Sequence, residues 1–379
     1  MPAVTTADEL LERALAGERL SLEDGLRLYQ EASDDALRQA ADQLRQQRHS
    51  AGIVTYLVDR NINYTNVCII DCGFCAFYRK PASPDAYLLS HDEIGHKIEQ
   101  LLEWGGTRIL LQGGVHPYLK LDYYEGLLRF IKERYPTIQI DGFSPVEVWN
   151  IARIMKQPLA DILARLHAAG LDGLPGGGAE ILDNRTRQQI APHKGTWESW
   201  IEAERLAQRE GLTTSATMVF GFGEELEERV LHLIRLRDLQ DESLAHNGNG
   251  FTSFICWSYQ PDHTAMGGTR APGAEYLRMV AFSRLMLDNF DNISASWPSQ
   301  GPVLARKALR CGANDFGSTM MEENVVSAAG ADVGTCMTIA QIHEQIRLAG
   351  FRPAKRDSRY HILETFDEAH APSAPQTPR

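Results

Sequence analysis

The sequence contains no long run of apolar residues. A stretch of roughly 20 apolar residues, which is what crossing a bilayer requires, is found nowhere in the 379-residue chain. The N-terminus, MPAVTTADELLERALAGERL, also lacks the basic start and continuous apolar stretch of a secretory signal. We therefore expect no membrane partner and a cytoplasmic location.

Positive charge is also in short supply. The chain has 38 lysine and arginine residues against 50 aspartate and glutamate residues, a formal net charge of −12. Because nucleic-acid binding requires clustered lysine and arginine to neutralise phosphates, this balance argues against a nucleic-acid partner. An anionic substrate would have to be held by local cations, since the overall charge does not attract it.

The cysteines do not resemble a disulfide framework. The chain has six cysteines and no secretory signal, and three of the six, Cys68, Cys72 and Cys75, fall within eight residues. The other three are isolated, and we expect them to be buried apolar side chains: Cys256, Cys311 and Cys336. The uneven spacing marks the first group as a functional candidate.

From about residue 62, short apolar or β-branched runs alternate with longer helical patterns. The expected strands are 63–67, 108–112, 138–143, 171–174, 213–219, 251–255, 292–296 and 312–317. A strand followed by a helix, repeated about eight times, predicts an α/β fold with parallel strands. Eight units fit a TIM-type (β/α)8 barrel. An open doubly wound sheet is the alternative, and eight units favour it less than the barrel.

Three segments are expected along the chain. Residues 1–50 alternate apolar and charged positions at helical spacing and predict an N-terminal helical extension. Residues 51–363 would form the barrel, and the Pro/Ser/Ala-rich residues 364–379 a disordered tail. Nearly every expected strand ends in a polar or glycine-rich loop, and the C-terminal ends of barrel strands are where such folds carry their chemistry.

The cysteine group has the spacing Cys-x3-Cys-x2-Cys, in the segment NYTNVCIIDCGFCAFYRK. Thiolates are the ligands of zinc and of iron–sulfur clusters. A structural zinc site normally has four protein ligands, often in paired CxxC groups, and the chain has no second CxxC. Three thiolates on one loop instead favour a [4Fe-4S] cluster with one iron left open for a ligand.

This motif, with Phe74 directly before the third cysteine, resembles that of the radical S-adenosylmethionine (SAM) superfamily. The resemblance implies a [4Fe-4S] cluster on Cys68, Cys72 and Cys75, with SAM as the cosubstrate that yields methionine and a 5′-deoxyadenosyl radical. It also implies SAM-binding roles for residues at the ends of successive strands, namely Phe74, Gln112, Gly113, Gly114, Ser144, Glu147 and Glu180.

Further motifs narrow the resemblance. The segments DRNINYTNVC, LQGGVHP, LDGLPGGGAEIL, GANDFGSTMMEENVV and AGFRPAKRDSRY together resemble the cyclic dehypoxanthinyl futalosine synthase family of menaquinone biosynthesis, over about residues 50–360. This family closes a ring by taking hydrogen from C4′ of the substrate ribose and joining that carbon to the benzoate ring. Sibling enzymes making aminofutalosine or deazaflavin are the alternative. A third hypothesis is a binding or scaffold protein that has no catalytic activity and is stabilised by a metal ion. This hypothesis predicts bound zinc rather than iron.

The family resemblance implies a nucleoside-derived small-molecule substrate and an electron donor such as flavodoxin or ferredoxin. The benzoate needs a local cation or several hydrogen-bond donors. Its candidate cations are Arg79, Lys80, His116 and Arg356. Candidate readers of the sugar hydroxyls follow the last strand: Asn314, Asp315, Ser318, Thr319 and Glu322. Candidate wall residues are Tyr259, Gln260 and Trp297, and candidate general bases are Asp315, Glu180 and His116.

Overall fold

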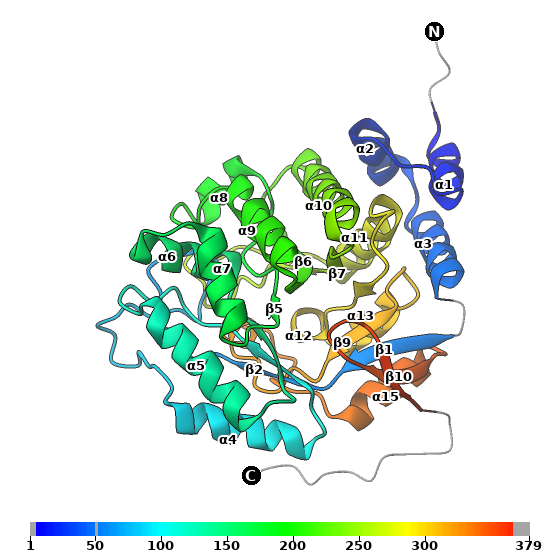
Figure 1. The fold of residues 1–379 in the computed structure, drawn as a ribbon. Coiled ribbons are helices and arrows are strands. Elements are labelled where there is room, and N and C mark those ends of the chain that lie inside the picture. The colour runs from blue at the N-terminus through cyan, green and yellow to red at the C-terminus, as the bar shows by residue number, and fades with distance from the viewer. Residues whose placement is uncertain (1–4, 50–51, 367–379) are drawn as a thin grey trace.

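Parallel strands form a barrel in the computed structural model, which describes residues 5–49 and 52–366 (Figure 1). The first barrel strand is divided at Val58 into β1 Ile53–Leu57 and β2 Asp59–Ile62. The other seven are β3 Arg108–Leu111, β4 Gln139–Gly142, β5 Gly173–Leu174, β6 Thr213–Phe220, β7 Phe251–Ser258, β8 Ile293–Ser294 and β9 Asp315–Ser318. From β2 to β9 each strand pairs in parallel with the next, and β9 pairs in parallel with β1.

Hydrogen bonds between the ends of the first and last strands close the barrel. The amide of Thr319 donates to the carbonyl oxygen of Leu57 at 3.0 Å. One step further, the amide of Met321 donates to the Asp59 carbonyl at 3.2 Å, and the Asn61 amide donates to the Met321 carbonyl at 2.9 Å. Because β2 also pairs with β3, the two edges of the sheet meet at the divided strand. The predicted TIM-type α/β barrel is confirmed.

Helices cover the outside of the barrel. The first, α4 His91–Glu103, begins at a capping box in which Ser90 and Glu93 satisfy each other's free amides. The others are α5 Leu121–Arg134, α6 Pro145–Met155, α7 Leu159–Ala168, α8 Asn184–Ile190, α9 Trp197–Glu210, α10 Leu226–Asn247, α11 Gly273–Met286, α13 Pro302–Ala308 and α15 Ile339–Leu348. Two short helices, α12 Trp297–Gln300 and α14 Val325–Ala328, instead contribute residues to the lining of the internal cavity. Within residues 5–49 and 52–366, no helix is long and apolar enough to span a bilayer.

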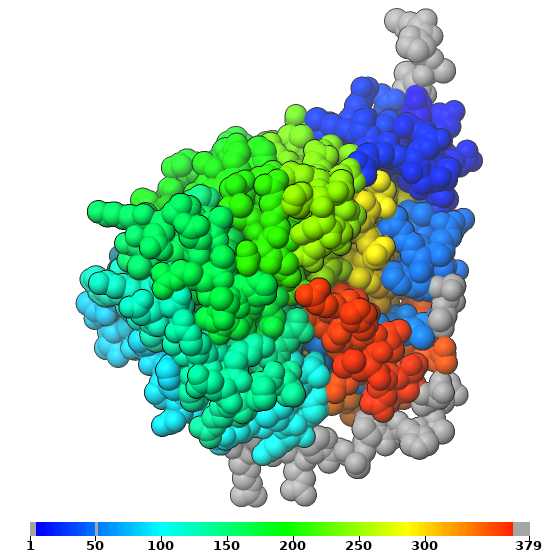
Figure 2. Space-filling view, in the orientation of Figure 1, coloured from blue at the N-terminus to red at the C-terminus, as the bar shows by residue number. Residues whose placement is uncertain are grey.

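Three N-terminal helices lie on one flank of the barrel: α1 Ala7–Leu15, α2 Leu22–Glu31 and α3 Asp34–Arg48. They contact α10 and α11, and Figure 2 shows them (blue) seated beside that part of the barrel. The Arg48 guanidinium donates to the carbonyl oxygens of Phe290 at 2.6 Å and Asp288 at 2.8 Å. The segment expected to be helical, 1–50, therefore contains helices throughout its described part.

The C-terminal segment closes the floor of the barrel, at the N-terminal ends of the strands. Strand β10 Arg352–Arg356 pairs in parallel with β1, and β11 Ile362–Thr365 pairs antiparallel with β10. The Arg356 side chain enters the barrel and forms a buried ion pair with Asp315, with 2.6 Å between Nε and Oδ2. The floor is therefore made from both ends of the barrel domain.

The sequence-based expectation was wrong in two places. Residues 63–67 are a loop with isolated bridges at Thr65 and Val67, and the first strand begins ten residues earlier, at Ile53. The polar sequence of β2 hides this strand, because Asp59 and Asn61 face the interior and are buried there by partners from distant strands. Strand β11 extends to Thr365, past the predicted start of the tail at 364, and residues 367–379 lie outside the described residues.

Candidate active site

The three clustered cysteines lie on one loop, which follows β2 and folds back on itself. The Cys68 amide donates to the Arg79 carbonyl at 2.9 Å, and the Arg79 amide donates to the Asn66 carbonyl at 2.7 Å. The Arg79 guanidinium donates to three further carbonyl oxygens of the loop, those of Ala76, Phe77 and Tyr78. Arg79 therefore holds the cysteine loop in shape.

The three thiols line a common cavity and lie close enough to interact electrostatically. Burial raises the pKa of the Cys68 thiol, and it raises that of Cys72 to about 12. Metal binding at these thiols would therefore release protons. Among the described residues, no three His, Cys, Asp or Glu side chains converge on a single-ion position. A cubane does not need such convergence, because its cysteines bind different irons.

Glycines at the end of β3 let a second loop approach the cysteine loop. A Cβ atom on Gly114 would lie 2.2 Å from the Val67 carbonyl oxygen and 2.9 Å from the Cys68 Cβ. A Cβ on Gly113 would meet the ring of Tyr64 at 2.7 Å. Both positions exclude any larger residue because backbone passes against backbone or a buried ring. Together with Gln112, these predicted SAM-binding residues line the cavity.

Glu147 is a second predicted cofactor residue that the fold brings to this cavity. Its carboxylate accepts hydrogen bonds from the Tyr64 hydroxyl at 2.7 Å, the Ser144 hydroxyl at 2.7 Å and the Gly113 amide at 3.2 Å. Burial raises the pKa of Glu147 to about 7, and the hydrogen bonds oppose that shift. The carboxyl therefore changes charge near neutral pH, next to the cysteine loop.

Glu180 is held by a residue that the sequence analysis did not identify, Lys194. The Lys194 ammonium pairs with Glu180 Oε1 at 2.7 Å and lies 4.8 Å from the centre of the Phe74 ring. Glu180 Oε2 is buried and lies 4.0 Å from the Arg187 guanidinium, but it has no hydrogen-bond partner among the described residues, and the backbone at Glu180 has the rare positive φ of 42°. Strained, under-satisfied carboxylates of this kind suit a ligand contact.

The loop that carries Lys194 is fixed by Arg187. This buried guanidinium donates to the carbonyl oxygens of Gly178 at 3.0 Å, Ala179 at 2.8 Å and Gly195 at 3.0 Å. Lys194 lies in the segment APHKGTW, which carries no motif that would single it out. Only packing places it beside Glu180, so its position could not be predicted from sequence.

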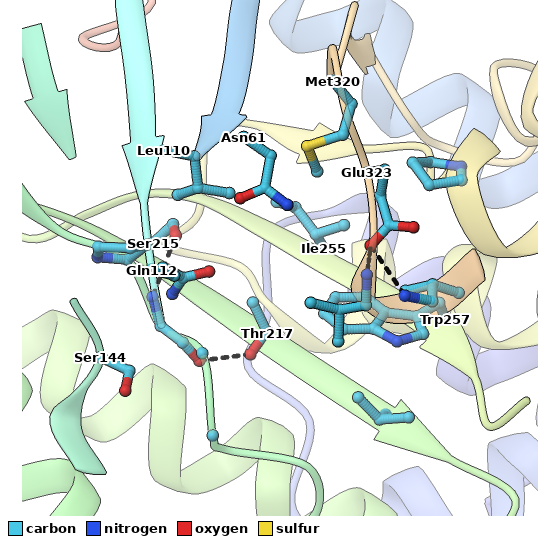
Figure 3. Close-up of a pocket in the computed structure, with 18 of the residues that line it drawn as sticks. Asn61, Leu110, Gln112, Ser144, Ser215, Thr217, Ile255, Trp257, Met320 and Glu323 are labelled. Atoms are coloured by element: carbon cyan, nitrogen blue, oxygen red, sulfur yellow. Dashed lines mark hydrogen bonds between the residues drawn. The ribbon is translucent and has the colours of Figure 1, made fainter. Parts of the chain in front are cut away.

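The cavity has a volume of about 460 Å³ and extends from the cysteine loop to the floor. Figure 3 shows one polar wall with Gln112, Ser144 and Ser215, and facing it a wall with Ile255, Trp257 and Met320. The predicted wall residues Tyr259, Gln260 and Trp297 also line the cavity. It is therefore suited to a ligand with both sugar-like and aromatic parts.

The predicted carboxylate-binding cations do not gather around the cavity. Lys80 is exposed, Arg79 braces the cysteine loop and also pairs with Asp85, and His116 accepts from the Tyr118 amide at 3.2 Å. None of these three lines the cavity. Arg356 does line it, but its guanidinium is bonded to Asp315.

Of the residues that were predicted to bind sugar hydroxyls, one lines the cavity and the other four do not. Ser318 lines the cavity, whereas Asn314, Asp315, Thr319 and Glu322 do not. Asn314 accepts from Arg284 at 2.7 Å, Thr319 bonds the backbone of Asp59, and Glu322 pairs with Arg60 and Lys97. Both Asp315 oxygens are occupied within the floor, so nothing in its surroundings frees it to act as a base.

A TIM-type barrel with a three-cysteine loop at the mouth of its cavity defines the class of radical SAM enzymes. The family model of the radical SAM superfamily matches residues 62–236, and that described as the CofH/MqnC C-terminal region matches residues 248–369. The chain belongs to the radical SAM superfamily and, within it, to the family of the cyclic dehypoxanthine futalosine synthases and their siblings.

The relatives are similar over nearly their whole length. The cyclic dehypoxanthine futalosine synthase of Halalkalibacterium halodurans is 47% identical, with 96% of this chain and 97% of the relative covered. The enzyme of the same name from Streptomyces coelicolor is 41% identical, with 95% and 89% covered. The aminodeoxyfutalosine synthase of Thermus thermophilus is 37% identical, with 96% and 97% covered.

Among solved structures, methylornithine synthase has a TM-score of 0.71 with 20% sequence identity, and 91% of this chain and 97% of that chain are covered. At that identity the likeness shows the fold, and it agrees with the closed barrel described above.

Proposed function

We propose that this enzyme converts dehypoxanthine futalosine to its cyclic product in menaquinone biosynthesis. The observation that carries the proposal is the site itself: a three-cysteine loop opens onto one cavity with a polar and an aromatic wall. The relatives at 47% and 41% identity, both named cyclic dehypoxanthine futalosine synthase, support the choice of substrate.

The residues around the cysteine loop fit the cluster and SAM. Cys68, Cys72 and Cys75 supply three thiolates, and the open fourth iron would take SAM. When bound, the cluster and SAM supply an electron and a 5′-deoxyadenosyl radical. The unpartnered Glu180 Oε2 offers an acceptor for an amine or hydroxyl of SAM, and Lys194 orients that carboxylate.

The two walls would orient the substrate for ring closure. We propose that the aryl ring lies against the side with Trp257 and Trp297, and the sugar carbons toward Ser215 and Thr217. Holding the sugar carbon and the ring together turns bond formation into an intramolecular step, which is where positioning accelerates a reaction. The buried surroundings would also shield the radical from solvent.

The proposal includes an electron donor of the flavodoxin or ferredoxin class, since the cluster must be reduced before SAM is cleaved. It also includes a cytoplasmic location, because cysteines that form no disulfide within the described part of the chain suit a reducing compartment.

The test is an anaerobic assay of the reconstituted, reduced enzyme with SAM and dehypoxanthine futalosine, analysed by mass spectrometry. We expect a product lighter than the substrate by two hydrogens, with one deoxyadenosine formed for each product. Deoxyadenosine without that product would move the assignment to a sibling reaction, such as that of aminodeoxyfutalosine synthase. No deoxyadenosine from an enzyme with an intact cluster would contradict the proposal as a whole.

A further inference from the structure

Two carboxamide side chains that line the cavity each have a buried oxygen without a hydrogen-bond partner in the described part of the chain. Asn61 lies on β2 and Gln260 follows β7, and each is only 4% exposed. Both line the cavity, yet Asn61 Oδ1 and Gln260 Oε1 have no hydrogen-bond partner among the described residues. A buried polar atom without a partner is costly, so atoms of this kind facing a cavity point to a ligand.

The orientation of the Asn61 amide is fixed by chemistry. Asn63 Nδ2 donates to the carbonyl oxygen of Gln112 at 3.1 Å, and a carbonyl can only accept, so Asn63 Oδ1 faces the other way. That oxygen accepts from Asn61 Nδ2 at 3.2 Å and from Asn324 Nδ2 at 3.3 Å. Rotating the Asn61 amide would set two oxygens against each other. The unpartnered atom of Asn61 is therefore its oxygen, and not its NH2 group.

The same reasoning fixes Gln260. Its Nε2 donates to the carbonyl oxygen of Ser258 at 2.9 Å, so its Oε1 must be the atom left over. The Ser258 hydroxyl accepts from Gln300 Nε2 at 2.9 Å and, at the longer distance of 3.4 Å, from Gln260 Nε2 itself. One cavity is thus lined by two side chains, one on β2 and one in the loop after β7, that each have a neutral acceptor without a partner among residues 5–49 and 52–366.

Other polar groups of the cavity do not offer the same chemistry. The cations that line it, Arg108, Lys194 and Arg356, are each in an ion pair. Glu180 Oε2 also lacks a hydrogen-bond partner among the residues described, but this carboxyl group is paired with Lys194 and Arg187. Neutral acceptors favour hydroxyl donors and disfavour anionic groups, whose oxygens they would repel.

We propose that Asn61 and Gln260 accept hydrogen bonds from hydroxyl groups on the sugar-derived part of the substrate and so determine specificity for it. This rests on the proposed function for the identity of the substrate. An analogue that lacks the hydroxyl leaves a buried acceptor unpaired, which weakens binding by about 5- to 150-fold.

The test measures substrate dissociation constants anaerobically on the cluster-loaded enzyme. The ligands are dehypoxanthine futalosine and analogues that each lack one hydroxyl, and the proteins are the unaltered enzyme, Asn61→Leu and Gln260→Met. We expect each variant to bind the full substrate about 5- to 150-fold more weakly. For each variant, one analogue should bind no worse than the full substrate. Iron content and SAM affinity should not change.

Gln208→Met is the matched control, since Gln208 is a buried amide that does not itself line the cavity and whose hydrogen bonds to Thr214 and Ser243 are made within the protein. The fold loss of affinity caused by each substitution can be compared with the fold loss caused by each missing hydroxyl. If the two losses multiply for every analogue, the side chains and the hydroxyls act independently, and the proposal is wrong. It is also wrong if SAM affinity falls in place of substrate affinity. The affinities of the unaltered enzyme for the analogues can be measured even if a variant misfolds. If the unaltered enzyme binds every analogue as tightly as the full substrate, the proposal is wrong.

Failure of the proposed function would look different. In that case the unaltered enzyme would give no cyclic product, and the same variants would be tested with 5-amino-6-(D-ribitylamino)uracil. That ribityl compound appears in the name of relatives, one of them 38% identical to this chain. A loss of its affinity in Asn61→Leu and Gln260→Met would support hydroxyl reading, and unchanged affinity would contradict it.

Discussion

The two ends of the barrel interior use buried polar residues in opposite ways. At the floor, Arg356 pairs with Asp315, and Arg108 pairs with Asp59 and Asp141, so most of the charges are satisfied within the protein. Toward the cysteine loop, oxygens of Asn61, Glu180 and Gln260 have no partner among the described residues. Satisfied polar groups stabilise a fold, whereas unsatisfied ones beside a cavity are available to a ligand. Two buried groups at the floor, Ser358 Oγ and Arg108 Nε, also lack a hydrogen-bond partner within the described part of the chain, so the two ends differ in how the carboxylates and carboxamides are used and not in every polar atom.

The largest effect is expected at the cysteine loop. Cys72→Ser removes one of three thiolates and should abolish product formation and most of the bound iron, about four atoms per chain in a full cubane. Iron analysis and the anaerobic assay measure both. Cys256→Ser changes a buried cysteine of β7 outside the loop and should leave the iron content unchanged. An active Cys72→Ser enzyme would mean that the loop does not hold the cluster.

The next largest effect tests the floor. Asp315→Ala leaves the Arg356 guanidinium buried without its partner, and we expect it to lower the free energy of unfolding by about 3–5 kcal/mol. Denaturant unfolding measures this. Asp35→Ala breaks an exposed pair with Arg38 and should cost no more than about 1 kcal/mol. Similar losses in the two variants would show that the floor is not a buried ion-paired layer.

A smaller effect is expected for Lys194→Met, which removes the cation that orients Glu180. We expect SAM affinity to fall by about 10- to 100-fold, as for other residues that position a metal or cofactor ligand. Equilibrium binding of SAM to the cluster-loaded enzyme measures it. Lys307→Met, at an exposed position on α13, is the control. Unchanged SAM affinity in Lys194→Met would place Glu180 outside the cofactor site.

The smallest effect comes from Glu204 on α9, a buried unpartnered carboxyl that lies away from both ends of the cavity. Burial raises its pKa well above the ordinary value, and both oxygens lack a partner among the described residues. Glu204→Leu should raise the free energy of unfolding by about 1–3 kcal/mol. Thermal or denaturant unfolding measures this, and Glu202→Leu, at a half-exposed site on the same helix, should change stability by about 0.5 kcal/mol or less.

The increase in the free energy of unfolding that we expect for Glu204→Leu depends on pH in a definite direction. In the unfolded chain Glu204 ionises near its ordinary pKa, whereas the folded protein keeps its proton to higher pH. The folded state therefore loses stability as pH rises from the unfolded pKa toward the folded one. The benefit of Glu204→Leu should be larger at pH 8 than at pH 5. A benefit that does not depend on pH would show that the carboxyl is not buried as described.

The sequence predicted the features that depend on local pattern or on tight spacing. The strand–helix rhythm gave seven of the eight barrel strands to within a few residues, because buried parallel strands are short apolar runs. It failed at β2, since a strand reading DRNI looks like a loop until Arg108 and Thr319 bury its polar side chains. The three cysteines could be found because their spacing on one loop is itself the motif.

The amino-acid sequence by itself determined the barrel, the cysteine loop and the family, since these follow from periodicity and from residues close together in the chain. Tertiary structure alone decided which polar side chains are free. Asp315 and Asn61 are both polar residues on barrel strands, but Arg356, forty-one residues after Asp315, occupies the carboxylate of Asp315. Nothing among the described residues occupies the Asn61 oxygen. A hydrogen-bond partner is a matter of distance in space, and folding brings together residues that the sequence separates.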